Sequence, residues 1–387
     1  MSEWKEYRLE DFADINPSES IPKGTIAKKI PMEFIQAFTK RIPDYLLEEY
    51  KGGVKFRNGD TLMARITPSL ENGKTSYVDI LDEDEIGFGS TEFIVLREKE
   101  NISDRQFLYY LAISPTIRFT AIKSMTGSSG RQRVQTDVVK EHIFDAPKLE
   151  EQRTIASVLS SLDDKIDLLH RQNQTLEQMA ETLFRQWFVE EFDNANYVKL
   201  GKLVNTVDNR GKTPPWSEEK TEYPLIEVNA LGNRLVDYSK IKKYVDEETF
   251  TTWFRAHPKK YDTLLSTVGS IGEFSMFIEE YGSIAQNVVA FQAKGISPFY
   301  LYQTLKFFSR DIKEFDIGSV QPSIKVSHLR EYEIPVCTNF ENFKEFDKIS
   351  LDICSKLEAN QTQISTLTTL RDTLLPKLMS GEVRVEM

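Results

Sequence analysis

The sequence predicts an α+β fold in which two similar globular domains are each followed by a long helix, and the two helices pack together. Two observations lead to this prediction. Apolar residues recur at heptad spacing in two long segments, and short motifs of the first half of the chain return in the second half. A chain of 387 residues is also long enough to form two or three domains with sizeable cores.

The first long helix is predicted in the middle of the chain. Its apolar positions are separated by alternating steps of four and three residues, which is the spacing of a coiled-coil seam. The seam consists of Ile155, Leu159, Leu162, Ile166, Leu169, Asn173, Leu176, Ala180, Leu183 and Trp187. Such a seam predicts that one side of the helix is covered by another helix.

The second long helix is predicted near the end of the chain, in the same register as the first. Adding 191 to each seam position gives Phe346, Ser350, Ile353, Leu357, Asn360, Ile364, Leu367, Arg371, Leu374 and Leu378, and only Ser350 and Arg371 depart from the apolar-or-Asn pattern. Each seam holds one asparagine, at different levels, and a polar seam residue fixes register at a cost in stability. Two unrelated amphipathic helices would be the simpler explanation. The shared register, and the similar segments ETLF (181–184) and DTLL (372–375), instead favour two copies of one element that pack together.

The segments before the two helices also repeat, at offsets that drift between 188 and 202. The matching segments are 59–67 with 261–270, 103–111 with 297–305, 126–134 with 317–324, and 144–149 with 332–337. Drifting offsets indicate insertions and deletions within a common framework. The chain is therefore predicted to alternate globular domain and long helix, twice.

Each globular half combines short strands with one helix. Strand-like runs at 60–66, 91–97, 224–231, 262–268 and 287–293 are separated by Gly, Asn and Pro turns, and helical spacing occurs at 105–114 and 298–308. These features predict a mostly antiparallel or mixed, curved sheet, without fixing the strand order. The aromatic segment 185–192 is predicted to pack in the core rather than to contact a partner.

The composition is that of a soluble globular protein, with 40% hydrophobic and 28% charged residues. No apolar run approaches the roughly 18 residues that cross a bilayer, and the first residues lack a signal-peptide core. We therefore expect a cytoplasmic protein without membrane contact. Cys337 and Cys354 are too few for a disulfide framework and are predicted to be buried thiols. The net charge of −11 argues against a stand-alone nucleic-acid binder but leaves local basic patches open.

Several segments resemble the specificity subunit of type I restriction–modification systems. LEEQRTIASVLSSLDDKIDLLHRQNQTLEQMAETLFRQWF (149–188) is similar to the central spacer of that family, and LRDTLLPKLMSGEV (370–383) to its C-terminal spacer. GDTLMARITPSLENGK (59–74) and GSVQPSIKVSHLREYEIP (318–335) resemble its target-recognition domains. The resemblance covers nearly the whole chain. The second spacer lacks the Glu-Gln start found at Glu151 and Gln152, which leaves the beginning of its helix open.

The resemblance implies a pseudo-two-fold molecule with two target-recognition domains, 1–147 and 193–335, a central spacer helix within 148–192 and a C-terminal spacer helix within 336–387. The spacers are expected to pack as an antiparallel coiled coil. Each domain is expected to read one half of a bipartite double-stranded DNA target. The spacers are expected to dock two methyltransferase subunits, to which translocating endonuclease subunits attach. No catalytic activity, cofactor or metal is expected in the chain itself.

Catalytic alternatives fit the residues less well. TPPW (213–216) resembles the motif that holds a flipped adenine in adenine methyltransferases, but Thr213 lacks the carbonyl acceptor for the amino group, so a rigid Pro-Pro turn near the DNA is favoured. The acids of segment 43–51 are spaced as on a solvated helix face rather than as in a nuclease. The four histidines, His142, His170, His257 and His328, show no metal-ligand spacing. A self-sufficient fused methyltransferase and restriction enzyme is the alternative function, but it would need cofactor motifs that we do not find.

The candidate DNA-binding residues lie on Gly- and Ser-rich loops. Arg pairs with guanine and Gln with adenine through two hydrogen bonds, so such loops can discriminate bases. In the first half these residues are Arg65, Lys74, Arg131, Gln132 and Arg133, and in the second half Gln321, Ser323 and Lys325. Arg210, Lys212 and Arg234 are assigned to phosphate contacts.

Overall fold

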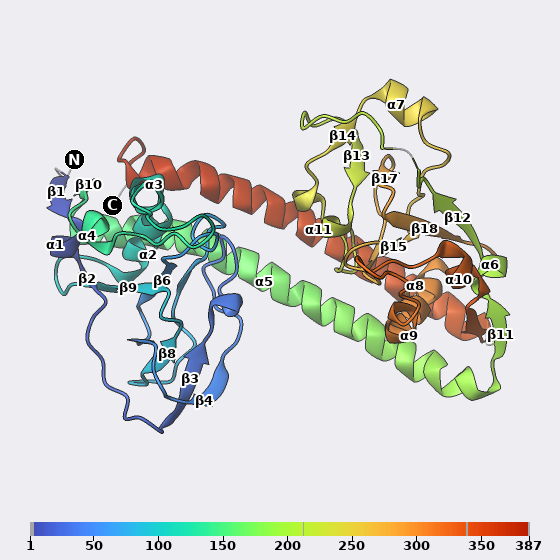
Figure 1. The fold of residues 1–387 in the computed structure, drawn as a ribbon, viewed down its shortest axis with the longest axis horizontal. Coiled ribbons are helices and arrows are strands. Elements are labelled where there is room, and N and C mark those ends of the chain that lie inside the picture. The colour runs from blue at the N-terminus through green and yellow to red at the C-terminus, as the bar shows by residue number, and fades with distance from the viewer. Residues whose placement is uncertain (1–3, 212, 338–339, 386–387) are drawn as a thin grey trace. The chain divides into compact units, whose positions relative to one another are not determined.

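The structure, a computed structural model, describes residues 4–211, 213–337 and 340–385. The chain divides into two compact units (Figure 1). Unit 1 is formed by residues 1–168 and 366–387, and unit 2 by residues 169–365. Within the described residues, no helix is both long and apolar enough to cross a membrane.

Unit 1 contains two four-stranded sheets. The first is antiparallel, in the order β2 (Ala13–Ile15), β9 (Phe93–Glu98), β6 (Thr61–Ala64), β7 (Thr75–Tyr77). The second is mixed, in the order β4 (Leu46–Glu49), β3 (Ile26–Ile30), β8 (Gly87–Gly89), β5 (Val54–Phe56), with β3 and β8 parallel. A short antiparallel pair joins β1 (Lys5–Arg8) to β10 (Ile143–Ala146). The short helices are α1 (Leu9–Phe12), α2 (Arg105–Ile113), α3 (Pro115–Lys123), α4 (Thr136–Lys140) and the 3₁₀ turn η1 (Met32–Phe34).

Unit 2 repeats this plan. Its antiparallel sheet has the order β12 (Val204–Asp208), β18 (Val288–Ala293), β15 (Thr263–Ser266), β16 (Phe274–Met276). Its second sheet has the order β14 (Tyr244–Val245), β13 (Tyr223–Ile226), β17 (Ser283–Ile284), with β13 and β17 parallel. β11 (Asn196–Lys199) pairs with β19 (Glu333–Val336). The remaining short elements are α6 (Leu200–Leu203), α7 (Glu247–Thr252), α8 (Pro298–Phe307), α9 (Ser309–Lys313), α10 (Val326–Glu331), η2 (Val189–Asn194), η3 (Val228–Ala230) and η4 (Tyr238–Lys240).

The two long helices, α5 (Leu149–Phe188) and α11 (Phe340–Met379), each contribute to both units. In unit 1, Ile155 and Leu159 near the start of α5 share one buried cluster with Leu375 and Leu378 near the end of α11. In unit 2, the other end of α5 shares a cluster with the first half of α11. The helices therefore pack antiparallel, as the resemblance implied. No seam position of either helix is exposed, so the heptad pattern does mark the covered face.

Among the polar seam positions, Asn173, Asn360 and Arg371 find partners within a unit, whereas the buried hydroxyl of Ser350 has none among the described residues. In unit 2, Asn360 Nδ2 donates to Asn173 Oδ1 at 2.7 Å, so the two asparagines lie at one level. The prediction that they stand at different levels is wrong, because it compared both helices in one chain direction whereas they run in opposite directions. In unit 1, Arg371 forms a buried ion pair with Asp163 at 2.8 Å.

The aromatic segment at the end of α5 belongs to the core of unit 2. Phe184, Phe188 and Phe192 are buried in the same cluster as Tyr300 of α8 and Phe346 of α11. Their rings meet at centroid distances such as 4.9 Å for Phe188 and Tyr300. The prediction of core packing is confirmed. Cys337 and Cys354 are free and buried, also as predicted.

The prediction for segment 43–51 is also wrong. Segment 43–51 is not helical; it contains β4, which pairs with β3 at the edge of the mixed sheet. Leu47 is 65% exposed there, and Glu48 forms an ion pair with Lys29 on the neighbouring strand at 2.9 Å. An edge strand with a solvated face can carry acids at spacings that also fit a helix, and pairing with a distant strand decides between the two.

Candidate nucleic-acid interface

In unit 1, three segments that are distant in sequence meet beside the antiparallel sheet, at a place that we call the unit 1 loop junction. It consists of residues 65–67 after β6, Glu92 before β9, and residues 131–134 of the Gly-rich loop between α3 and α4. Three backbone hydrogen bonds hold it together: Arg65 N to Glu92 O (2.9 Å), Val134 N to Arg65 O (2.8 Å) and Thr67 N to Gln132 O (3.0 Å). These bonds satisfy backbone groups of three separate segments and fix the positions of the segments relative to one another.

Unit 2 contains the same junction. It consists of residues 267–269 after β15, Asn287 before β18, and residues 321–324 of the loop between α9 and α10. The equivalent hydrogen bonds are Thr267 N to Asn287 O (2.8 Å), Ile324 N to Thr267 O (2.8 Å) and Gly269 N to Pro322 O (3.0 Å). The hydrogen bonds thus match four positions of the two junctions: Arg65 with Thr267, Glu92 with Asn287, Arg131 with Gln321, and Arg133 with Ser323. One framework carries two different sets of side chains.

The glycine at the start of each loop is required by close packing. A Cβ atom on Gly318 would lie 1.9 Å from the backbone oxygen of Gln321. In unit 1, Gly127 has a φ of +129°, and its Cβ would lie 3.1 Å from the backbone oxygen of Arg131. Any larger residue would therefore push the loop away from the junction.

The unit 1 loop junction is rich in arginine. Arg133 donates from Nε (3.0 Å) and Nη2 (2.6 Å) to the carboxylate of Glu92, and these hydrogen bonds hold the pKa of Glu92 below its ordinary value. Arg131 and Arg133 are exposed, whereas Arg65 and Gln132 are half-buried. The buried Nε of Arg65 has no hydrogen-bond partner among the described residues. The predicted residues of this loop are therefore brought together.

The unit 2 loop junction is rich in neutral polar groups instead. Gln321 and Lys325 are exposed and Ser323 is half-buried, so the predicted residues of this loop are also close to one another. The side-chain oxygen of Asn287 is buried and has no hydrogen-bond partner among the described residues. Asp316 ties the loop down, because its carboxylate accepts hydrogen bonds from the amides of Gly318 (2.8 Å) and Ser323 (2.9 Å).

An open cleft of about 460 Å³ adjoins the unit 2 loop junction. Val268 and Asn287 of the junction line it, together with Gln286, Arg210 and Trp216. Trp216 is 45% exposed, and Lys243 Nζ lies 4.7 Å from the centre of its ring. The TPPW segment thus contributes to a cleft wall and has no regular secondary structure.

The other predicted residues take different positions. Lys74 Nζ donates to the backbone oxygen of Met32 at 2.9 Å. Arg210 pairs with Asp208 through Nε (2.9 Å) and Nη2 (2.7 Å), and these bonds hold the pKa of Asp208 below its ordinary value although burial opposes them. Lys212 lies outside the described residues.

Among the candidates that the structure describes, the burial of Arg234 argues against its assignment to a phosphate contact. It is 1% exposed, and its guanidinium carbon lies 5.2 Å from the ring centre of Tyr302. A buried guanidinium cannot reach a phosphate on a DNA surface. The sequence placed Arg234 in a polar Gly-Asn loop but could not show that the loop turns this side chain into unit 2.

Two junction residues, Glu92 and Asn287, escaped the sequence analysis. Each lies within a strand-like run that the sequence predicted and directly precedes the observed strand, β9 or β18, and the two occupy equivalent positions at an offset of 195. This offset, which falls within the range of the other repeats, was the signal in the sequence that could have identified the two residues as equivalent. Glu and Asn are not similar enough to reveal the correspondence without the backbone hydrogen bonds.

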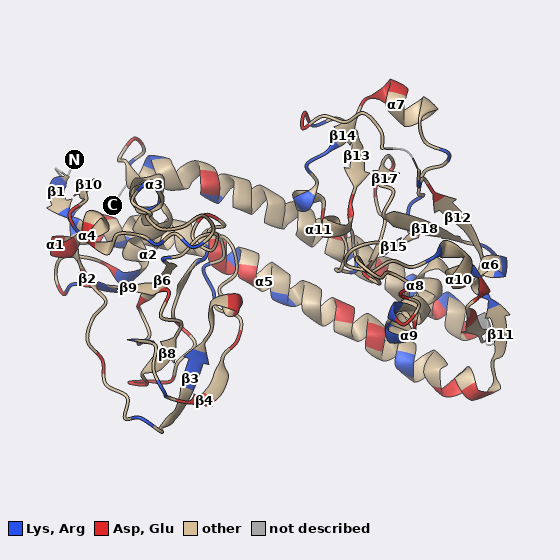
Figure 2. Cartoon of the chain, viewed as in Figure 1, with Lys and Arg blue, Asp and Glu red and all other residues tan. Residues whose placement is uncertain are grey.

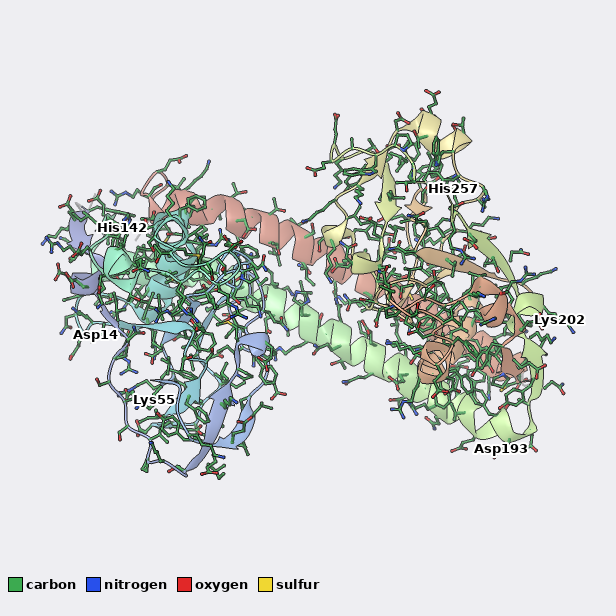
Figure 3. The ribbon with its side chains drawn as sticks, viewed as in Figure 1. Asp14, Lys55, His142, Asp193, Lys202 and His257 are labelled. Carbon is green, nitrogen blue, oxygen red and sulfur yellow. The ribbon has the colours of Figure 1, made fainter. Side chains whose placement is uncertain are left out.

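No group of three or more His, Cys, Asp or Glu that could hold a metal ion occurs in the part of the chain that the structure describes. His142 and His257, which Figure 3 labels, belong to different units. His257 stacks on Phe250 at 3.9 Å, and burial lowers its pKa. Lys and Arg are not confined to one element of either unit (Figure 2).

Known proteins resemble this chain in sequence and in fold. The family model for the type I restriction modification DNA specificity domain matches residues 1–178 and 193–373. The MjaIX type I restriction enzyme specificity subunit of Methanocaldococcus jannaschii is 26% identical over 306 residues, which cover 73% of this chain and 69% of that protein. The HindI specificity subunit of Haemophilus influenzae is 32% identical over 199 residues, 49% of this chain and 42% of that protein. The crystal structure of a type I S subunit from M. genitalium has a similar fold, with a TM-score of 0.59, 19% identity, and coverage of 100% of this chain and 97% of that one.

Proposed function

The chain belongs to the family of type I restriction–modification specificity subunits, and from this premise we propose that it reads a bipartite DNA target, with one half-site for each unit. The observation that carries the proposal is the loop junction that recurs in both units with different side chains. A shared backbone framework presents the two sets of side chains in the same way, and different side chains select different bases. Specificity subunits have no catalytic activity of their own, so chemistry on the DNA belongs to the other subunits of the system.

We further propose that α5 and α11 dock two methyltransferase subunits, through which endonuclease subunits join. A docked subunit would bury large apolar side chains that both helices expose. In unit 1 these are Val158 (37% exposed), Leu168 (40%) and Leu370 (44%), and in unit 2 Met179 (49%) and Leu351 (42%).

The test is to map methylated adenines on DNA exposed to the chain together with its cognate methyltransferase subunits. We expect a motif of two half-sites separated by a fixed number of unread base pairs. The chain alone, incubated with labelled methyl donor, should neither methylate nor cleave DNA. A contiguous motif would contradict the assignment of one half-site to each unit. Methyl transfer by the chain alone would instead support the alternative of a self-sufficient fused enzyme.

A further inference from the structure

We propose that the two loop junctions select different bases, guanine for unit 1 and adenine or its A·T pair for unit 2. The residue at one equivalent position, Glu92 in unit 1 and Asn287 in unit 2, helps to determine which base each junction selects. The inference rests on the proposed function and deepens it, because it assigns base classes to the half-sites and roles to two residues that the sequence did not indicate.

In unit 1, Glu92 positions Arg133 for a bidentate contact. The carboxylate engages the side of the guanidinium formed by Nε and Nη2, at distances of 2.6–3.0 Å. A guanidinium has five N–H groups in a planar fork, so the edge formed by Nη1 and Nη2 still has donors to offer. The Arg133 side chain is 47% exposed while that of Glu92 is only 23% exposed, so the arginine is the outer member of the pair. Glu92 is therefore a positioning residue and Arg133 is the contacting one.

The charges of the unit 1 loop junction suit guanine. Guanine presents two acceptors, N7 and O6, in the major groove, whereas the other bases present at least one group that an all-donor side chain cannot match. Arg65 and Arg131 stand in the same junction, and Glu92 offsets one of the three positive charges. A surface rich in donors and net positive charge fits this acceptor edge and the phosphates beside it.

The unit 2 loop junction replaces this set with side chains that both donate and accept. Asn287 stands where Glu92 stands in unit 1, and Gln321 and Ser323 stand where Arg131 and Arg133 stand. Adenine presents a donor at N6 beside an acceptor at N7, and a single Asn or Gln amide matches both. Gln321 is exposed and can make this contact directly, whereas the side-chain oxygen of Asn287 is buried, so Asn287 acts through the shape of the junction. The adjoining cleft of about 460 Å³ gives a base edge access, and Trp216 offers the paired thymine methyl an apolar surface.

The experiment compares methylation motifs of the complex reconstituted with its cognate methyltransferase subunits. The unit 1 variant Glu92→Asn with Arg133→Ser introduces the unit 2 residues at both positions. The unit 2 variant is Asn287→Ser. Arg57→Ser is the matched control in unit 1, because Arg57 is a comparably exposed arginine (54%) that is also paired with a glutamate, Glu19, but lies outside the junction. Glu92→Gln weakens the support of Arg133 and leaves the arginine in place.

We expect the unit 1 variant to lose selection for a guanine in one half-site, by about fivefold to hundredfold relative to the other bases, with the second half-site unchanged. Glu92→Gln should relax the same base to a smaller extent. Asn287→Ser should relax an adenine in the other half-site, and Arg57→Ser should change nothing. A merely structural role of Glu92 would lower overall methylation without changing base preference.

The inference is overturned if the half-site that responds to Arg133 contains no guanine, or if methylation falls equally for every base at each position, as expected of a phosphate contact. Should the unit 1 double variant fail to fold by circular dichroism, the motif of Glu92→Gln decides by the same criteria. A wild-type complex that methylates no bipartite motif would overturn the proposed function itself, which separates the two failures.

Discussion

Two equivalent aspartates, Asp60 in unit 1 and Asp262 in unit 2, have different surroundings. In unit 1, Asp60 accepts a hydrogen bond from the Arg57 amide (2.8 Å) and forms an ion pair with Arg97 (2.7 Å). In unit 2, the equivalent Asp262 keeps the amide bond, from Lys259 at 2.7 Å. The position of Arg97 is taken by Gln292, so no guanidinium balances the buried carboxylate, and burial raises the pKa of Asp262 to about 6.

This difference predicts the pH dependence of stability. Between the unfolded pKa near 3.8 and the folded pKa near 6, native unit 2 binds a proton that the unfolded chain has released, so the free energy of unfolding falls as pH rises. The total effect is about 3 kcal/mol. Asp262→Asn should remove most of this decline. Denaturant unfolding at about pH 4.5 and 7, followed by tryptophan fluorescence, measures it, because Trp187, Trp216 and Trp253 all lie in unit 2.

Asp60→Asn is the control for the aspartate prediction. It removes an ionic partner of Arg97 and should destabilise unit 1 at neutral pH, where Asp262→Asn should not be destabilising. Equal pH dependence in the wild type and in Asp262→Asn would contradict the prediction.

At the scale of elements, a buried or half-buried polar contact in each unit helps to hold α5 and α11 in register. In unit 1, Arg371 of α11 pairs with Asp163 of α5, both less than 10% exposed as side chains. Tyr110 of α2 donates to the same carboxylate at 2.6 Å, and burial raises the pKa of Tyr110, so its hydroxyl remains a donor. In unit 2 the contact is the Asn173–Asn360 hydrogen bond. Each contact is satisfied in one alignment of the helices only, which specifies register.

Removing the cation of the buried pair should be costly. Arg371→Met leaves Asp163 buried with Tyr110 as its remaining polar partner, and we expect unit 1 to lose about 3–5 kcal/mol. The exposed pair Lys140–Asp137 provides the control, because Lys140→Met should cost less than about 1 kcal/mol. Thermal and denaturant unfolding measure both. The double variant Asp163→Leu with Arg371→Met should recover much of the loss, and equal losses in single and double variants would argue against an ionic contribution.

At the scale of the whole molecule, each unit combines one recognition fold with parts of both long helices. Unit 1 contains the beginning of α5 and the end of α11, whereas unit 2 contains the end of α5 and the beginning of α11. Unit 1 also joins the two ends of the chain. The Arg384 guanidinium lies 4.9 Å from the ring centre of Trp4 and forms an ion pair with Glu151 at 2.8 Å. The helices are thus structural members of both units as well as connections.

If helix length sets the spacing of the half-sites, lengthening α5 should lengthen the unread segment of the DNA target. Inserting one heptad after Asn173 adds about 10 Å of helix and nearly restores the facing side. At about 3.4 Å per base pair this is at most about three base pairs. Because α11 is unchanged and DNA rotates with every added pair, we expect a shift of about one to three base pairs, with both half-sites retained. The methylated motif of the reconstituted complex is the measurement. An active variant with the original spacing would leave the helices as a docking surface only.

The sequence by itself determined the repeat, the two long helices and the family, because these depend on patterns along the chain. Heptad spacing marks the covered face of a helix wherever that helix docks, and the strand-like runs at 60–66 and 287–293 contain β6 and β18. The loops that carry Arg131, Arg133, Gln321 and Ser323 were also predictable, because glycine, serine and basic residues gather there.

Only the tertiary structure decided which distant residues meet. It paired Asn173 with Asn360, gave Arg371 its partner Asp163, turned Arg234 into unit 2, and made segment 43–51 an edge strand. It also placed Glu92 beside Arg133 and linked Asn287 to Ile324 through the backbone of Thr267, which revealed the loop junction. Such contacts join segments separated by tens to hundreds of residues, and their energy depends on burial and on the partner that arrives. Neither quantity is a property of a local stretch of sequence.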